Sequence, residues 1–111
     1  MAVIDPTTEQ AVRDFMRRIP ADLRVERALL FGSRARGDFD EESDADVALV
    51  LREGGDDWRV LWRLAGVAWQ VFVETGIYIQ PVPISSEDWA DPKRVLRPSF
   101  LLSIKREGIS L

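Results

Sequence analysis

The sequence predicts an α/β fold of the α+β kind, a small two-layer mixed sheet of about three to four strands backed by helices. Segments with helical periodicity alternate with short apolar runs, and glycine or proline separates most of them. The chain has 111 residues, enough for one domain with a buried core and too few for two. Its composition, 46% hydrophobic and 31% charged, is typical of a globular domain. We therefore expect residues 1–111 to form a single domain.

The first part of the chain predicts a helix followed by a strand. Thr7 and Gln10 fit a capping box, and apolar residues then recur at helical spacing until Pro20 ends the pattern. Residues 25–31 are a predicted strand that becomes fully apolar toward its end. Because Gly32 follows directly, we expect a glycine turn at the C-terminal end of this strand.

The middle of the chain predicts a second strand and a long helix. Residues 44–51 end in an apolar run, and the glycine pair at 54–55 then interrupts the chain. Asp56 or Asp57 can cap a helix over residues 57–75, which the following glycine closes. This helix is apolar around much of its circumference, so it either crosses the core or meets a partner.

The last part of the chain predicts one more strand and one more helix. Residues 76–83 have the composition of a strand, and the two prolines in them favour an edge position. Ser85 or Ser86 can cap a short turn. A final amphipathic helix is expected to end at Gly108.

The composition excludes several kinds of chemistry. The chain has no cysteine and no histidine, which removes disulfides, thiolate zinc sites, imidazole bases and the Ser-His-Asp triad. Any catalysis must therefore rest on carboxylates, a metal and arginine. The formal net charge of −4 argues against general binding of nucleic acid. No apolar stretch approaches the roughly 20 residues of a membrane span, and the first residues lack the features of an export signal, so we expect a cytoplasmic protein.

One motif combines a phosphate-binding turn with a pair of carboxylates. Gly32 and Ser33 offer backbone N–H groups and a hydroxyl to phosphate oxygens. Asp44 and Asp46 are two residues apart in a predicted strand, so both side chains project from the same face. Two carboxylates at this spacing can bind one divalent cation, and Mg²⁺ prefers such oxygen ligands together with substrate phosphates. The motif therefore predicts a site for a metal-bound nucleotide.

The order of elements and this motif resemble the minimal nucleotidyltransferases of the DNA polymerase beta-like superfamily, including those of the antitoxin type. The similarity extends from residue 25 to residue 82 and includes the terminal segment 100–109. It implies the nucleotidyltransferase fold and transfer of a nucleoside monophosphate, AMP from ATP, to an acceptor with loss of pyrophosphate.

The resemblance also implies a role for each residue of the motif. Gly32 and Ser33 would hold the β- and γ-phosphates, and Asp44 and Asp46 would ligate Mg²⁺ in a two-metal site. The two arginines that follow the turn would neutralise the departing pyrophosphate; they are Arg34 and Arg36. Such a transfer depends mainly on positioning and on charge stabilisation.

The sequence departs from the family pattern at the third carboxylate. Active members carry an acid on the strand after the long helix, where this chain has Gln80 as the nearest polar residue. An amide oxygen is a weaker ligand than a carboxylate and is not a base. Glu74, Glu87 and Asp88 lie nearby in the sequence and are alternative candidates.

Two functions of different class follow. The first is a metal-dependent nucleotidyltransferase that modifies a protein, and the resemblance suggests a helical HEPN-type toxin as the acceptor. The second is a weak or inactive antitoxin-like module that acts by contact alone. The helix at 57–75 would contact the helical partner or a second copy of the chain in a homo-oligomer.

Overall fold

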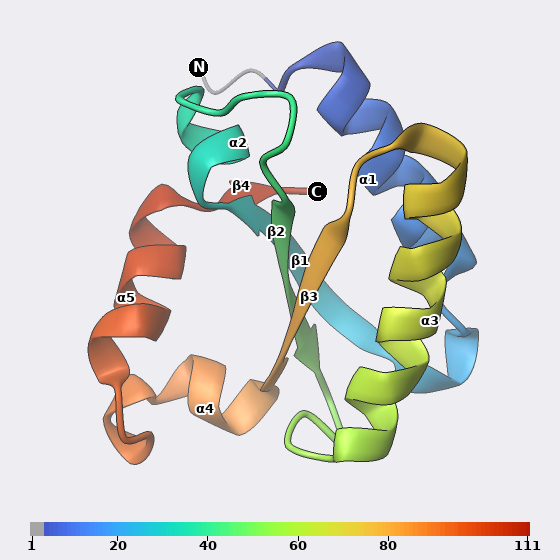
Figure 1. The fold of residues 1–111 in the computed structure, drawn as a ribbon. Coiled ribbons are helices and arrows are strands. Elements are labelled where there is room, and N and C mark those ends of the chain that lie inside the picture. The colour runs from blue at the N-terminus through green and yellow to red at the C-terminus, as the bar shows by residue number, and fades with distance from the viewer. Residues whose placement is uncertain (1–3) are drawn as a thin grey trace.

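The computed structural model describes residues 4–111 and contains one mixed sheet of four strands. The strand order is β3-β2-β1-β4, with β2 antiparallel to β1 and parallel to β3, and β4 antiparallel to β1 (Figure 1). The strands are β1 (Val25–Phe31), β2 (Ala45–Leu51), β3 (Ile79–Ser85) and β4 (Ile109–Ser110). The predicted mixed sheet of three to four strands is confirmed.

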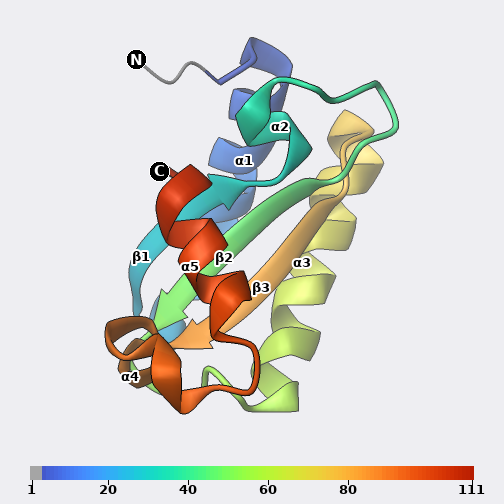
Figure 2. The same cartoon turned by 90° about the vertical axis from the view of Figure 1, so that its left-hand side faces the viewer.

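Helices lie on both faces of this sheet (Figures 1 and 2). The helices are α1 (Pro6–Arg18), α2 (Ser33–Arg36), α3 (Trp58–Thr75), α4 (Ser86–Ala90) and α5 (Pro98–Glu107), with short 3₁₀ turns at Ala21–Leu23 and Pro92–Arg94. Helices α1 and α3 cover one face, and α5 covers the other. The predicted α/β fold, a mixed sheet backed by helices, is confirmed, and α5 buries Leu101 and Ile104 against the second face.

The helix ends show which capping predictions hold. Asp5, and not Thr7, caps α1, because its carboxylate accepts a hydrogen bond of 3.0 Å from the Thr8 N–H. Pro6 fits the first position of α1, where no N–H donor is needed. Asp57 caps α3, and Gly76 ends it in the left-handed conformation, both as predicted. Ser85 caps α4.

The larger core lies between the sheet and helices α1 and α3. Alternate residues of β2 point into it, and all of them are buried: Ala45, Val47, Leu49 and Leu51. From the helices, Phe15 of α1 and Leu64 of α3 are fully buried against them. The other residues of β2 face α5, so Asp46 and Ala48 lie on the second face of the sheet.

The edge strand β3 carries the predicted prolines. Pro81 and Pro83 lie opposite Val47 and Leu49 of β2 in the parallel register. Proline has no N–H to donate, which restricts it to positions such as an edge.

Within the described part of the chain, none of the helices combines the length and apolar character that crossing a bilayer requires.

Candidate active site

Gly32 joins β1 to α2 and lies against the carboxylate of Asp46. Its φ of 78° is in the region that favours glycine. A Cβ atom added to Gly32 would lie 2.2 Å from Oδ2 of Asp46, closer than any real contact. Glycine is therefore required here for its backbone angle and for its missing side chain, and the structure brings together two predicted site residues that are 14 positions apart.

The turn after Gly32 is a short helix, α2, with Ser33 as its first residue. The N–H groups of Ala35 and Arg36 donate to the Gly32 carbonyl at 3.1 and 3.0 Å, and the N–H of Gly37 donates to the Ser33 carbonyl at 2.8 Å. The first N–H groups of a helix have no partner within the helix. In α2 these unpaired N–H groups directly follow Gly32, which lies against Asp46. There they can donate hydrogen bonds to phosphate oxygens, together with the Ser33 hydroxyl.

Asp44 and Asp46 form a pair of interacting carboxylates. Asp44 is exposed just before β2, and Asp46 is partly buried as the second residue of the strand. Burial raises the pKa of Asp46, the negative charge of Asp44 raises it further, and the positive charge of Arg36 opposes both effects. Two neighbouring carboxylates, one of them partly desolvated, fit a hard divalent cation, because the cation removes their repulsion.

Arg36 lies close enough to Asp46 to affect its pKa, and two acids hold it there. Its Nε is 3.3 Å from Asp38, and its Nη1 is 3.6 Å from Glu107 at the end of α5. Glu107 was not among the predicted site residues, because it lies more than 70 residues from Arg36 in the sequence and reaches it only through the packing of α5 on this face of the sheet. The arrangement leaves Arg36 about half exposed and able to meet an anionic ligand.

Arg34 is not placed for the phosphate contact that the resemblance implied. Its side chain is buried, with only 4% of the residue exposed. The guanidinium donates to the Ser43 carbonyl at 2.8 Å, the Thr8 hydroxyl at 2.7 Å and the Asp40 carbonyl at 3.4 Å. It also stacks on the ring of Phe39, 4.7 Å from the ring centre. Arg34 therefore ties the loop before β2 to α1, and so positions the two aspartates.

Gln80 occupies the place where a third carboxylate is expected. It is the direct neighbour of Asp46 in the parallel pair β2–β3, so the two side chains share one face of the sheet. Gln80 is exposed. In residues 4–111, no cluster of three or more acidic, histidine or cysteine side chains is suited to a metal ion. Asp44 and Asp46 are the two carboxylates of the predicted metal site that the structure places at this end of β2.

The alternative acids have other positions. Glu74 forms an ion pair with Arg18 of α1, and Glu87 pairs with Arg94 at 2.6 Å. Asp88 lies on α4, where its N–H donates to the Ser85 hydroxyl at 3.1 Å. None of the three therefore lies beside Asp46 on the face of the sheet where Gln80 lies.

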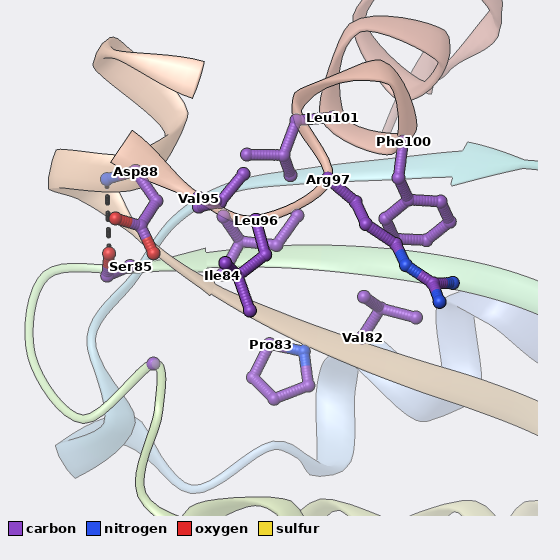
Figure 3. Close-up of a pocket in the computed structure, with 11 residues that line it drawn as sticks. Val82, Pro83, Ile84, Ser85, Asp88, Val95, Leu96, Arg97, Phe100 and Leu101 are labelled. Atoms are coloured by element: carbon purple, nitrogen blue, oxygen red, sulfur yellow. Dashed lines mark hydrogen bonds between the residues drawn. The ribbon is translucent and has the colours of Figure 1, made fainter. Parts of the chain in front are cut away.

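A cavity of about 370 Å³ lies on the same face of the sheet as Asp46 and Gln80 (Figure 3). Val82, which lines it, is two residues after Gln80 on β3, roughly 7 Å along the strand. Figure 3 shows Arg97 and Phe100 reaching from the start of α5 over Val82. The ring of Phe100 also packs edge-on against Phe31 at 5.9 Å, next to the Gly32 turn. The cavity therefore lies on the Asp46 side of the sheet, between β3 and the start of α5, and Phe100 is the lining residue that also contacts the end of β1.

The chain belongs to the nucleotidyltransferase domain family, which matches residues 10–97. The site geometry and this match define an enzyme of the nucleotidyltransferase class.

Two relatives come from the archaeon Methanocaldococcus jannaschii. The chain is 41% identical over 102 residues to "Putative protein adenylyltransferase MJ0604", covering 90% of this chain and 93% of that protein. It is 27% identical over 104 residues to "Putative protein adenylyltransferase MJ0141", covering 92% of this chain and 96% of the relative. The similarity therefore extends over nearly the whole length of all three chains.

Proposed function

We propose that this protein is a metal-dependent adenylyltransferase that transfers AMP from ATP to a hydroxyl group of a protein. The observation that carries the proposal is the close approach of the Gly32 turn to the carboxylate of Asp46. Phosphate-binding groups on this turn would then lie beside the carboxylates that would hold the metal. The names of the two relatives support ATP as the donor and a protein as the acceptor.

In this proposal the α2 turn and the Ser33 hydroxyl hold the β- and γ-phosphates, and Arg36 faces the departing pyrophosphate. Asp44 and Asp46 would hold one divalent cation, Mg²⁺ in our proposal, which supplies charge stabilisation when bound. The acceptor oxygen forms a bond to the α-phosphorus while the bond from that phosphorus to the bridging oxygen breaks. Pyrophosphate leaves with the electron pair, and the acceptor proton passes to water, because the amide of Gln80 cannot take it.

The cavity beside Val82 suits the nucleoside. It lies on the same face of the sheet as Gln80, with Val82 two residues further along β3, and its lining is largely apolar, with the ring of Phe100 able to contact a flat base. We therefore expect Phe100→Ala to weaken ATP binding, whereas Leu102→Ala, which changes an exposed residue on the same helix, should not. If Phe100→Ala bound ATP as tightly as Leu102→Ala, the cavity would not hold the nucleoside and would be available to the acceptor protein.

The proposal is tested by Mg²⁺-dependent ATP binding and by transfer of labelled AMP. With the natural chain, calorimetry should show ATP binding that requires the metal, and label should appear on protein in a cell extract. Asp46→Asn should reduce the transfer rate by about three orders of magnitude, since a metal clamp contributes several kcal/mol to the transition state. The matched control is Glu42→Gln, an exposed acid of the same loop. Metal-independent binding or full activity of Asp46→Asn would refute the proposal.

Gln80 gives a test by gain of function. If the missing carboxylate limits turnover, Gln80→Glu should raise the transfer rate at least about tenfold, because a positioned base typically contributes 10²–10⁴-fold. The measurement is initial rate of AMP transfer at saturating ATP. An unchanged rate would mean that another group already supplies this function.

A second candidate is contact-only binding, favoured by the amide at the position of the third acid. It predicts that Asp44→Asn with Asp46→Asn still binds and silences a partner. A HEPN-type toxin as that partner and a cytoplasmic location remain predictions, and an adjacent gene for a helical HEPN protein would support them.

A further inference from the structure

The outer side of α3 exposes large apolar side chains. Trp58 and Trp62 are 72% and 75% exposed, Trp69 is 59% exposed and Val73 is 66% exposed. Tryptophan is enriched in protein contacts and is rarely left this accessible. The core alternative for this helix therefore accounts only for its inner side, where Leu64 and Val71 are fully buried.

These exposed residues form one continuous stripe. At about 100° per residue, the four of them fall within about 60° of one another, opposite the buried side of the helix. Ala65 and Gly66 lie halfway along the stripe, one on each of its two borders. The stripe is thus a row of bulky residues with small residues halfway along it, over roughly 22 Å of helix.

Nothing within residues 4–111 explains the glycine at position 66. A Cβ atom at this position would meet nothing within 4 Å, and its φ is not among the positive values. A glycine inside a helix costs about 1 kcal/mol relative to alanine. Close approach of another backbone at this point would account for the missing side chain.

The spacing of the stripe identifies that other backbone as a second copy of α3. Counted from the Ala65–Gly66 peptide bond, Trp62 and Trp69 are equally distant on either side, and so are Trp58 and Val73. Two antiparallel copies related by a two-fold axis through this point therefore place Trp62 beside Trp69 of the partner helix, with the small residues at the crossing. Such a self-complementary surface is what a symmetric dimer requires.

The charges agree with this arrangement. In the antiparallel pair, Arg59 of one copy and Glu74 of the other lie on the same side of the contact, roughly 3 Å apart along the axis, while within its own chain Arg59 pairs with Asp57 and Glu74 pairs with Arg18. The Arg59 and Glu74 side chains are more than half exposed, at 73% and 53%. The two-fold axis repeats this opposite-charge pair at the other end of the stripe.

We propose that the protein forms a symmetric homodimer through the outer side of α3, with the two helices antiparallel and crossing at Gly66. The proposal goes beyond the adenylyltransferase function and does not depend on it, because its tests need neither ATP nor metal. A failure of one proposal is therefore distinguishable from a failure of the other.

Cysteine cross-linking tests the register directly, because the chain has no cysteine of its own. Under mild oxidation, Gly66→Cys should form a covalent dimer in high yield, since the two copies are about 1.5 Å apart along the axis. Trp58→Cys alone should not, because its copies are about 22 Å apart. A mixture of Trp62→Cys with Trp69→Cys should cross-link more than either variant alone. Self-linking of Trp58→Cys would indicate parallel helices and overturn the proposal.

The molecular mass in solution gives an independent test of dimerisation, which does not depend on the register of the two helices. Light scattering of the natural chain should give twice the monomer mass of 12.6 kDa. Trp62→Glu should weaken dimerisation by at least about 30-fold, as expected for loss of a central aromatic residue. Leu102→Glu on α5 is the matched control and should not change it. A monomer at all concentrations, or a complex only with a different protein, would overturn the proposal.

Discussion

The two faces of the sheet differ in how completely they are covered. The face under α1 and α3 carries the larger core, to which every second residue of β2 contributes a buried side chain. The face under α5 carries a smaller core, and it also carries Asp46, Gln80 and the cavity. Residues next to one another in β2 thus belong alternately to the core and to the site. The comparison teaches that stability and chemistry can be changed separately in this strand.

The largest effect is expected on the face of the sheet under α1 and α3. Leu64→Ala removes a fully buried side chain between α3 and the sheet, so the free energy of unfolding should fall by about 2–5 kcal/mol. Urea denaturation measures this change, with the half-exposed Leu102→Ala as the control that should change it little. The metal-dependent affinity of folded Leu64→Ala for ATP should remain normal. A lost affinity would show that the two faces are coupled.

A smaller effect should separate the two arginines of α2. Arg34→Ala leaves buried acceptors at Thr8 and Ser43 without their donor, and we expect a loss of about 1–3 kcal/mol in unfolding free energy. Arg36→Ala removes exposed ion pairs and should cost less than about 1 kcal/mol, while slowing AMP transfer. Thermal unfolding and transfer rates of both variants check this. If Arg34→Ala slowed AMP transfer and Arg36→Ala caused the larger loss of stability, Arg34 would be the residue that contacts the phosphates.

The smallest effect concerns pH. The pKa of Asp46 is raised in the folded chain, so folding favours its protonated form, and this stabilisation is lost as the pH rises through the folded-state pKa. Without metal, Asp46→Asn should therefore raise the melting temperature at pH 7. The advantage should shrink as the pH falls toward the ordinary aspartate value of 3.8. Melting curves at several pH values, with Glu42→Gln as control, measure this, and a constant difference would argue against a raised pKa.

The sequence predicted the bounds of β1 well, because local signals mark them, whereas the strand predicted over residues 76–83 covers Ile79–Ser85. The bounds of β1 and the caps of α3 follow from an apolar run, an aspartate and a glycine, each of which acts within a few residues. The same local reasoning was wrong at α1, where Pro6 lets Asp5 start the helix earlier. Strand β4 was not predicted, since two residues carry no periodicity and depend on pairing with β1.

The sequence by itself determined the chemistry that is possible: carboxylates and arginines without histidine or cysteine, a glycine turn after an apolar strand, and no acid at position 80. Only the tertiary structure decided which side chains meet. It placed Gly32 against Asp46, buried Arg34, brought Glu107 to Arg36 and set Gln80 beside Asp46. The physical reason is that residue type and local periodicity fix what a side chain can do and where elements begin. Register and packing between distant elements, which no local pattern encodes, fix its neighbours.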